Sequence, residues 1–586
     1  MAAKRDKRAK QVRRAEAARP SYAGRRRTVL ALFVLAGAAL VWGAVDRQIF
    51  EKDFLQSEGA DRYLDTVEMP AHRGMITDRH GAVLAVSTPV ESVGANPRLL
   101  RPNSRTLVPL ARALGMAPDE LRDRLADHGH RRFVYLKRRI PPDQADAVRA
   151  LIEAEAIEGV RLEREYRRYY PAGEVFAHVV GFTNVDDQGQ EGLELAYDQA
   201  LAGQPGIKRV LRDGRRLVVD DVESIRMPRP GRHLALSIDR RLQFIAYREL
   251  LAAVQKHQAK AGSAVLLDVR TGEILAMVNQ PAYNPNGSRR NTRGRLRNRA
   301  LTDVYEPGST MKPFTVAAAL ELGLYRADAQ IETAPGYFYV GRARVRDHHN
   351  LGLIDLPTLL RKSSNVGAGK IALDLPKEDF WRYLSELGFG ADAGTGFPGE
   401  AGGQLTLPAN WARIDQATLA FGYGMSATTL QLARAYAVLA ADGQRRPVSL
   451  LRVEHAPEGE QVFRPEVARA VRAMLETVVG EGGTATAAAV PGYRVAGKTG
   501  TVKKVGADGY SDDRYLALFA GMAPASDPQL VMVVMLDEPG GDKYYGGEVA
   551  APVFAAVMDD ALRILNVAPD ALPEGQVQLV QAEAAQ

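Results

Sequence analysis

The segment from residue 28 to 45 constrains this chain more than any other, because its eighteen residues ("TVLALFVLAGAALVWGAV") include no charged side chain. A helix of this length can cross the hydrocarbon core of a bilayer, which is about 30 Å thick. Three arginines (25–27) directly precede it, and basic residues favour the cytoplasmic side of a membrane. The sequence therefore predicts a cytoplasmic basic tail over 1–27, a transmembrane helix over 28–45, and a chain that lies outside the cytoplasm from Asp46 onward.

A cleaved signal peptide is the alternative interpretation of this segment. Its apolar stretch is usually only about 7–15 residues long and ends at a small-residue cleavage site. Here the apolar stretch is longer, the basic leader is unusually long, and no clean A-x-A site follows. These features favour an uncleaved anchor.

Charge and composition exclude several classes of function. The net charge of +7 is concentrated in residues 1–27, which hold 11 Lys or Arg and 2 Asp or Glu, whereas the rest of the chain holds 66 and 68. A nucleic-acid-binding protein should carry its positive charge on the folded domain, so the sequence predicts no nucleic-acid partner. The absence of cysteine excludes disulfides, thiolate catalysis and cysteine-based zinc sites.

Residues 46–230 are predicted to form a non-catalytic domain, which we call the pedestal. The pattern of 73–87 predicts a hairpin that turns at His80 and Gly81. The stretch 97–128 predicts helices, the second of which opens at Pro118, and 191–203 predicts a helix closed by Gly203. His178 lies in an apolar stretch, where a packed and hydrogen-bonded histidine is expected rather than a catalyst.

A Pro-Arg-Pro-Gly connector (228–231) indicates a domain boundary, after which the pattern changes. Paired apolar runs at 264–278 and 515–536 predict hairpins, and 428–441 and 551–565 predict helices. Antiparallel hairpins with helices grouped around them indicate the α+β class. The predicted domains after the membrane segment are the pedestal (46–230), a catalytic domain (231–570) and a C-terminal tail (571–586).

The sequence "EPGSTMKP" contains the only serine of the chain that is followed three places later by lysine, Ser309 with Lys312. Pro313 is tolerated only in the first turn of a helix, so Ser309 should lie at a helix N-terminus, where the dipole favours negative charge on oxygen. Positions i and i+3 share a helix face, which predicts that Lys312 lies against the Ser309 hydroxyl. The lysine can act as a base only if burial lowers its pKa, and the apolar run after Pro313 should bury it.

Two further motifs are each unique in the chain: an S-x-N at Ser363 and Asn365, and a K-T-G at 498–500. Either motif alone is a weak signal. Together with the serine–lysine pair, in the order S-x-x-K, S-x-N, K-T-G, they form a strong one.

The K-T-G segment predicts the place where an anionic substrate group binds. Lys498 offers a positive charge, and Thr499 and Thr501 offer hydroxyl groups. Gly497 and Gly500 are expected to bare a strand edge, so that the backbone of a ligand can approach closely.

These three motifs resemble the transpeptidase domain of penicillin-binding proteins. The wider sequence resembles the class B, division-specific peptidoglycan D,D-transpeptidase of the FtsI type found in Gram-negative bacteria. The stretches that carry this resemblance are "RGMITDRHGAVLA", "YYPAGEVFAHVVGFTN", "RNRALTDVYEPGSTMKPF", "LLRKSSNVG", "FGYGMSATTLQLARAYA", "GKTGTVKKVG" and "KYYGGEVAAPVF". The resemblance implies an antiparallel sheet with helices on both sides, preceded by an elongated, dimerisation-like pedestal and one transmembrane helix.

The resemblance also implies a mechanism. Ser309 would attack the D-Ala-D-Ala carbonyl of a stem peptide with Lys312 as its base, and Ser363, held by Lys312 and Lys498, would relay the proton to the departing D-alanine. Asn365 would orient the substrate amide and Lys312.

In the same scheme the K-T-G segment (498–500) and Thr501 would hold the substrate. Thr499 and Thr501 would bind its terminal carboxylate, and the backbone N–H groups of Ser309 and Thr501 would form the oxyanion hole. Transfer of the acyl group to an amine of a neighbouring strand would give a 4→3 cross-link, and β-lactams would trap Ser309. No cofactor or metal is implied, and the histidine-containing segment "DHHN" (347–350) is expected to be a solvated loop rather than a ligand cluster.

Several other interpretations of the sequence remain open. The elongation-specific class B transpeptidase shares all three motifs, and a non-catalytic penicillin-binding sensor or scaffold is a non-enzymatic alternative. A class A synthase would need a glycosyltransferase domain, for which no acidic motif is found. A β-lactamase would need a glutamate beside the serine, whereas the glutamates at 378, 386 and 400 have polar or Gly-rich surroundings.

The implied partners are peptidoglycan stem peptides, the lipid-linked precursor polymer, β-lactams, a membrane glycosyltransferase of the FtsW type and other division proteins. The implied location is the inner membrane at the division septum, with the catalytic domain in the periplasm.

Overall fold

The computed structural model describes residues 23–54, 64–101, 105–155, 157–212, 218–287, 294–506 and 509–571. These residues form two compact units. The first comprises the chain up to Pro70 together with Pro205–Arg229, and the second comprises Ala71–Gln204 together with the chain from Pro230 onward. Most of the predicted basic tail and nearly all of the predicted C-terminal tail lie outside the described residues.

The helix α2 spans Ala23–Val45 and continues as a single π-helical segment over Asp46–Phe50. It begins before the predicted membrane segment and therefore includes the three arginines at 25–27. Apolar side chains are exposed all around it, for example Phe33 at 75% and Leu40 at 76%. A helix that is apolar on every side and uncovered by protein is suited to lipid. It is the one helix among the described residues that is long and apolar enough to cross a membrane.

The first unit also contains a three-stranded antiparallel sheet in the order β1-β8-β9. Its strands are β1 (Leu64–Met69), β8 (Gly206–Arg212) and β9 (Val218–Arg226).

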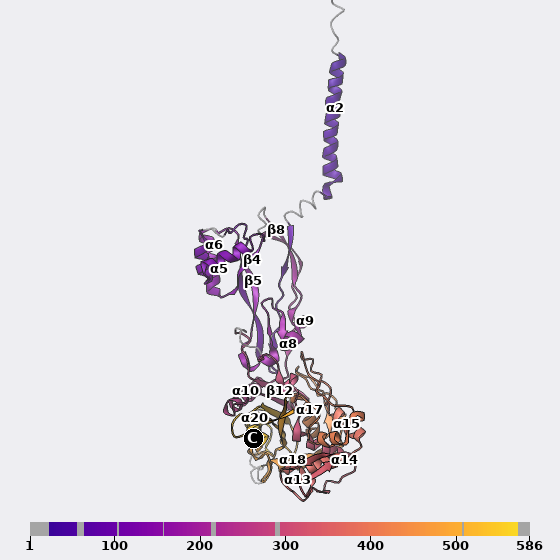
Figure 1. Cartoon of the computed structure of the whole chain (residues 1–586). Coiled ribbons are helices and arrows are strands. Elements are labelled where there is room, and N and C mark those ends of the chain that lie inside the picture. Colours follow the sequence, from indigo (N-terminus) through magenta and orange to yellow (C-terminus); the bar gives the residue numbers. More distant parts are fainter. Residues whose placement is uncertain are drawn as a thin grey trace, which may run out of the picture. The chain divides into compact units, whose positions relative to one another are not determined.

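The N-terminal part of the second unit is built on a long strand, β3 (Val83–Ala95). It forms the predicted hairpin with β2 (Ile76–Thr77) and then pairs with β4 (Val134–Ile140) and β5 (Val160–Tyr169), while β10 (Leu234–Ala235) pairs with β2. Helices α4 (Leu107–Leu114), α5 (Pro118–Asp127) and α6 (Pro142–Glu155) pack on the end of this ribbon (Figure 1). The predicted helices of 97–128 are confirmed, including the start at Pro118. Leu110, Leu121 and Leu136 belong to a separate small core at this end.

The predicted helix over 191–203 is two short helices, α8 (Gly192–Ala196) and α9 (Asp198–Ala202), that separate at Tyr197 and end at Gly203. Preceding them are the short elements η2 (Gly173–Val175), α7 (Ala177–Val180), β6 (Phe182–Thr183) and β7 (Gly189–Glu191). After the break, Asp198 accepts hydrogen bonds from the Gly189 N–H at 2.8 Å and from Arg73 at 2.7 Å. These long-range hydrogen bonds hold the chain in the two-helix conformation, and no local sequence pattern predicts them.

Arg73 is the centre of a buried ion network in the pedestal. Its guanidinium binds the Glu194 carboxylate at 2.7 Å, and Arg168 of β5 binds the other oxygen of Glu194 at 2.6 Å. All three side chains are at most 1% exposed. His178 is packed as predicted, with its ring bonded to the Arg295 carbonyl at 2.7 Å, and burial lowers its pKa to about 4.

The C-terminal part of the second unit contains a five-stranded antiparallel sheet in the order β12-β11-β21-β20-β19. The strands are β11 (Ala261–Asp268), β12 (Ile274–Gln280), β19 (Ala496–Gly506), β20 (Gly509–Ala523) and β21 (Leu530–Asp537). Both predicted hairpins are confirmed. Strands β11, β12 and β21 are buried on both faces, which explains their nearly continuous apolar sequences.

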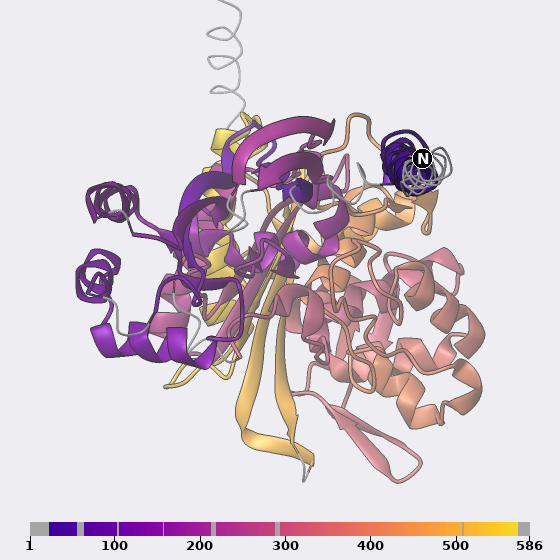
Figure 2. The same ribbon diagram turned by 90° about the horizontal axis from the view of Figure 1, so that it is seen from above.

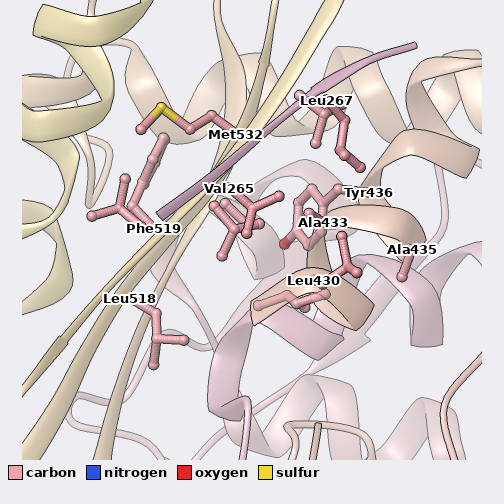
Figure 3. Close-up of a cluster of buried hydrophobic side chains, with 14 of the residues drawn as sticks. Val265, Leu267, Leu430, Ala433, Ala435, Tyr436, Leu518, Phe519 and Met532 are labelled. Atoms are coloured by element: carbon pink, nitrogen blue, oxygen red, sulfur yellow. The ribbon is translucent and has the colours of Figure 1, made fainter. Parts of the chain in front are cut away.

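Two groups of helices contact this sheet. One consists of α10 (Arg240–Lys256) and α20 (Ala551–Ile564), and the other of α17 (Thr429–Ala440) and α18 (Pro465–Val479), with α12 (Lys312–Glu321) packed on α18. Figure 3 shows Leu430, Ala433 and Tyr436 of α17 on one side of Val265 of β11 and Phe519 of β20 on the other. The Phe519 ring lies 4.8 Å from that of Phe554 in α20. The chain therefore has the predicted α+β architecture, and Figure 2 shows the sheet with the helices around it.

The remaining elements near the sheet are short. They are α11 (Arg299–Thr302), η3 (Gly308–Met311), β13 (Gln330–Glu332), β14 (Tyr337–Val340), β15 (Ala343–Arg346), β16 (Leu353–Asp355), α13 (Leu356–Lys362), α14 (Asn365–Asp374), α15 (Lys377–Glu386), η4 (Pro408–Asn410), α16 (Arg413–Leu419), β17 (Gln444–Arg445), β18 (Glu460–Gln461), η5 (Thr486–Ala488) and α19 (Gly546–Val549).

Candidate active site

Ser309 lies at the predicted helix start, in the 3-10 turn Gly308–Met311 that leads directly into α12. Pro313 occupies the first turn of α12, where a missing N–H costs no intrahelical bond. Gly308 has φ 59°, and a Cβ at this position would lie 2.3 Å from the Val502 side chain. Only glycine therefore allows the turn to lie this close to β19.

Lys312 is fully buried at the start of α12. Its ammonium group donates to the Ser363 carbonyl at 2.5 Å, to the Ser363 hydroxyl at 3.0 Å and to the Asn365 side-chain oxygen at 2.7 Å. Burial holds the pKa of Lys312 well below its ordinary value, and the charge of Lys498 lowers this pKa further. The predicted contact with Ser309 is not a hydrogen bond here, since the Ser309 hydroxyl has no partner among the described residues.

Ser363 joins the three motifs. Its hydroxyl accepts a hydrogen bond from Lys312 at 3.0 Å and a second one from Lys498 at 3.0 Å. It follows the last residue of α13 in a left-handed conformation with φ 60°, which is uncommon for a residue other than glycine. Lys498 is fully buried in β19, and burial lowers its pKa to about 7. Residues that are far apart in the sequence thus meet at one hydroxyl group.

Asp347 holds the S-x-N segment in place. One of its oxygens accepts a bond from the Ser364 hydroxyl at 2.6 Å, and the other accepts from the backbone N–H groups of Asn365 and Val366 at the start of α14. A carboxylate at this position stabilises the helix N-terminus. The expectation of a solvated loop over 347–350 is therefore wrong for Asp347, although His348 and His349 are exposed. No group of three or more metal-binding side chains occurs among the described residues.

Glycines 497 and 500 have a packing role besides the one predicted. Strand β19 is an edge strand, as expected. A Cβ at Gly497 would lie 2.5 Å from the Phe519 ring, and a Cβ at Gly500 would lie 3.1 Å from the Thr310 methyl group and 3.2 Å from the Pro307 carbonyl. The two glycines therefore let β19 pack against Phe519 and against the Ser309 turn, and the approach of a ligand backbone along this edge stays a prediction.

The two threonines predicted to bind substrate contact neighbouring loops. The Thr499 hydroxyl is bonded to the Thr484 hydroxyl at 3.1 Å, and the Thr501 hydroxyl accepts a bond from the Gly546 N–H at 3.0 Å. Thr484 was not indicated by any motif, because its link to Thr499 depends on the tertiary fold.

Glu306, three residues before Ser309, is a further polar group of the site that no motif indicated. One of its carboxylate oxygens accepts bonds from the Gly424 N–H at 2.9 Å and the Tyr510 hydroxyl at 3.0 Å. Its other oxygen is buried without a partner among the described residues, and burial raises the pKa of Glu306. This side chain links the turn before Ser309 to the β19–β20 hairpin.

The site combines a serine at a helix N-terminus with two buried lysines that share the hydroxyl of a second serine. This combination is typical of serine acyltransferases. The comparison with known families makes this assignment specific. The family model described as the penicillin binding protein transpeptidase domain matches residues 262–559, and that of the penicillin-binding protein dimerisation domain matches residues 68–236. The chain belongs to the penicillin-binding protein transpeptidase family.

Curated relatives cover nearly the whole chain. The peptidoglycan D,D-transpeptidase FtsI of Escherichia coli is 43% identical over 92% of this chain and 92% of its own length. The probable peptidoglycan D,D-transpeptidase PenA of Neisseria meningitidis is 42% identical over 93% of this chain and 94% of its own length.

Solved structures are similar as well. The transpeptidase domain of penicillin-binding protein 3 from Burkholderia pseudomallei is 45% identical, with a TM-score of 0.54, and covers 58% of this chain and 98% of that domain. A peptidoglycan synthetase from Bifidobacterium adolescentis has a TM-score of 0.70 at 25% identity and covers 87% of this chain and 98% of that protein.

The lowered pKa of Lys498 predicts how stability depends on pH when this lysine is replaced. An unfolded lysine has a pKa of about 10.4. Between pH 7 and 10 the unfolded chain therefore binds more protons at this position than the folded chain, so the stability of the wild type rises with pH. We expect Lys498→Met to be more stable at pH 7.5, and its advantage to shrink by about 1.4 kcal/mol for each pH unit up to about pH 10.

Unfolding measured at pH 7.5, 8.5 and 9.5 checks this expectation. Lys256→Met, the same change at an exposed position at the end of α10, serves as the control and should show no such trend. An advantage of Lys498→Met that does not change with pH would contradict the lowered pKa.

Proposed function

We propose that this chain is a septal peptidoglycan D,D-transpeptidase that cross-links stem peptides through an acyl-enzyme on Ser309. The observation that carries the proposal is the meeting of Lys312 and Lys498 at the Ser363 hydroxyl. It supports a proton relay near Ser309, whose own hydroxyl has no hydrogen-bond partner in the described part of the chain.

Acylation would begin with attack of the Ser309 oxygen on the carbonyl carbon of the penultimate D-alanine. Lys312 accepts the hydroxyl proton, because burial and the charge of Lys498 hold its pKa well below the ordinary value and so favour the neutral amine. The proton then passes through the Ser363 hydroxyl to the nitrogen of the departing D-alanine as the peptide C–N bond breaks. Asn365 keeps Lys312 and the substrate amide in position.

The substrate's terminal carboxylate would bind to Lys498, Thr499 and Thr501, and Gly500 would allow β19 to lie close to the reacting serine. The backbone N–H groups of Ser309 and Thr501 would stabilise the oxyanion. The first N–H groups of a helix have no intrahelical partner, so that of Ser309 is available for this role.

In the second half of the reaction, an amine of a neighbouring stem peptide attacks the ester carbonyl. The new amide bond forms the 4→3 cross-link, the bond to the Ser309 oxygen breaks, and the proton of the amine returns to Ser309 through the same groups in reverse. No cofactor enters either half.

A β-lactam would acylate Ser309 in the same way and then remain bound, and the three glutamates considered as bases for hydrolysis support this. Of the three glutamates weighed for this role, Glu378 and Glu386 are solvated, with side chains 70% and 39% exposed. Glu400 is not solvated as expected, since its carboxylate accepts bonds from Ala393 and Thr395 of its own loop. Glu400 therefore stabilises its own loop.

The membrane anchor and the pedestal support a role in the division machinery. We place the N-terminus in the cytoplasm, the catalytic domain in the periplasm and the protein at the septum, where it would act with a membrane glycosyltransferase of the FtsW type and other division proteins on lipid-linked precursor polymer. The name and near full-length similarity of the E. coli relative support division over elongation. Residues of all three motifs are present and lie in contact, which supports an enzyme rather than a non-catalytic sensor.

Ser309→Ala should abolish covalent labelling by a fluorescent penicillin, because the acylated oxygen is gone. The melting temperature should change little, since this hydroxyl makes no hydrogen bond to any residue that the structure describes. The control is Ser385→Ala, the same change on α15, which should be labelled like the wild type. Labelled Ser309→Ala protein would remove Ser309 from the proposed role.

A chromogenic cephalosporin separates the transpeptidase from a β-lactamase. We expect one burst of colour, stoichiometric with protein, followed by turnover on the order of 10⁻⁴ s⁻¹, a barrier near 23 kcal/mol. A competent β-lactamase at about 10² s⁻¹ has a barrier near 15 kcal/mol, so the two outcomes are far apart. Sustained colour development from pure protein would overturn the assignment.

A fluorescent fusion of the full chain tests the septal role. In dividing Gram-negative cells the fusion should collect at midcell, and a Ser309→Ala fusion should do so as well, because we attribute localisation to the anchor and pedestal. Distribution along the lateral wall would instead identify the elongation-specific relative.

A further inference from the structure

A cavity of about 610 Å³ lies between the β14–β15 hairpin and the second half of α14. Its walls come from β13, from the hairpin up to Gly341, and from three residues of α14, with Tyr325 and Arg413 completing the rim. Figure 2 shows this hairpin, in pink, projecting from the domain together with the gold β19–β20 hairpin. The volume is in the range of small-molecule binding sites, roughly 300–1,000 Å³.

The lining of the cavity combines aromatic rings with polar groups of both charges. Tyr339 of the hairpin is 61% exposed although it is a large ring, and Phe338 packs beside the Lys370 ammonium, which lies 5.9 Å from the ring centre. Ile331 and Val340 supply a buried apolar floor. Tyr339 also lines the cavity, and its exposed ring offers a flat face against which a ligand ring can stack.

The charged groups of the cavity are of both signs, and two of them are hydrogen-bonded to uncharged groups. Lys370 donates to the Glu332 carbonyl at 2.6 Å, and the Asp374 carboxylate accepts from the Tyr325 hydroxyl at 2.6 Å. Arg413 has no hydrogen-bond partner among the described residues. Donors and acceptors of both signs suit a neutral ligand rich in hydroxyl and amide groups. A phosphate-bearing ligand would face Asp374, and an apolar lipid would leave these charges without water or partners.

The cavity is connected to the active site by α14. Asn365, the first residue of this helix, binds Lys312, whereas Lys370, Leu373 and Asp374 near its end line the cavity. At 1.5 Å per residue, these positions are about 8 to 14 Å along the helix from Asn365. The peptide between the sugar and the scissile bond of a stem peptide has four residues, which reach about 14 Å when extended. An extended stem peptide is therefore long enough to span the distance along α14 from Asn365 to the cavity.

The hairpin surface between these two points is basic. In β15, Arg344 and Arg346 are exposed and pair across the strands with Tyr339 and Tyr337. The Arg346 carbonyl accepts a bond from the Asn365 side chain at 3.2 Å, so this surface begins at the active site. The segment 333–346 contains three arginines and no acidic residue. Free carboxylates of a stem peptide would be attracted along this path.

We propose that the cavity between the β14–β15 hairpin and α14 binds an N-acetylated sugar of the glycan strand whose stem peptide is bound at Ser309. This inference rests on the proposed function, which supplies the stem peptide. The Tyr339 ring stacks on the sugar, Lys370 and Arg413 donate to its hydroxyl and acetamido oxygens, and Asp374 accepts from its hydroxyl groups.

The test uses the full chain in detergent and a fluorescent tetrasaccharide of alternating N-acetylglucosamine and N-acetylmuramic acid without peptides. Wild-type protein should bind it, and prior reaction of Ser309 with penicillin should leave this binding unchanged. Tyr339→Ser and Lys370→Gln should each weaken binding at least about tenfold, since each removes a group that contacts the sugar. Tyr169→Ser on β5 and Lys377→Gln on α15, the same changes at positions outside the cavity, should bind like the wild type.

Penicillin labelling of each variant reports on its folding and on the proposed function separately. Labelled protein that fails to bind the tetrasaccharide, or cavity variants that bind it as tightly as the wild type, would overturn the sugar site and leave the transpeptidase assignment intact. Wild-type protein that binds the tetrasaccharide but is not labelled by penicillin would instead contradict the proposed function.

Discussion

Two buried lysines that share one hydroxyl group are the constraint on which the rest of this site depends. Lys312 and Lys498 both donate to Ser363, and neither side chain is exposed to water. Two ammonium charges this close in a dry site repel each other and lack hydration, so the site favours loss of a proton. Burial of this kind needs a large and rigid surrounding, which the sheet and the helices α12, α14 and α18 supply. The chemistry of the site is therefore a product of the packing of the whole domain.

Much of this arrangement could be predicted from the sequence, because its signals are local. Ser309 and Lys312 are one helical turn apart, and the hairpins of the sheet are apolar runs around turn residues. The role of Asp347 could not be predicted in this way, because its carboxylate binds the first residue of a helix that begins 18 residues later. The packing role of the glycines of β19 could not be predicted either, since only the fold reveals that Phe519 and the Ser309 turn occupy the space beside them.

The pedestal depends on a different kind of interaction. Arg73 and Arg168 hold the two oxygens of Glu194 in a buried network, and Asp198 supplies a further carboxylate to Arg73. Buried ion pairs contribute little net stability, because desolvation offsets most of their attraction, but removing one partner leaves an uncompensated charge. The break between α8 and α9 belongs to this network. Secondary structure in the pedestal is thus set by contacts across the chain as well as by local propensity.

The exposed apolar helix α2 affects how the protein meets its substrate. A protein held by one such helix diffuses in a plane, and its catalytic domain explores only the thin layer that its tether allows. If the donor strands are still attached to lipid, as the proposed function implies, they move in the same plane, and the two meet at a rate set by their surface densities. Mature wall beyond the reach of the tether would then not compete for the site.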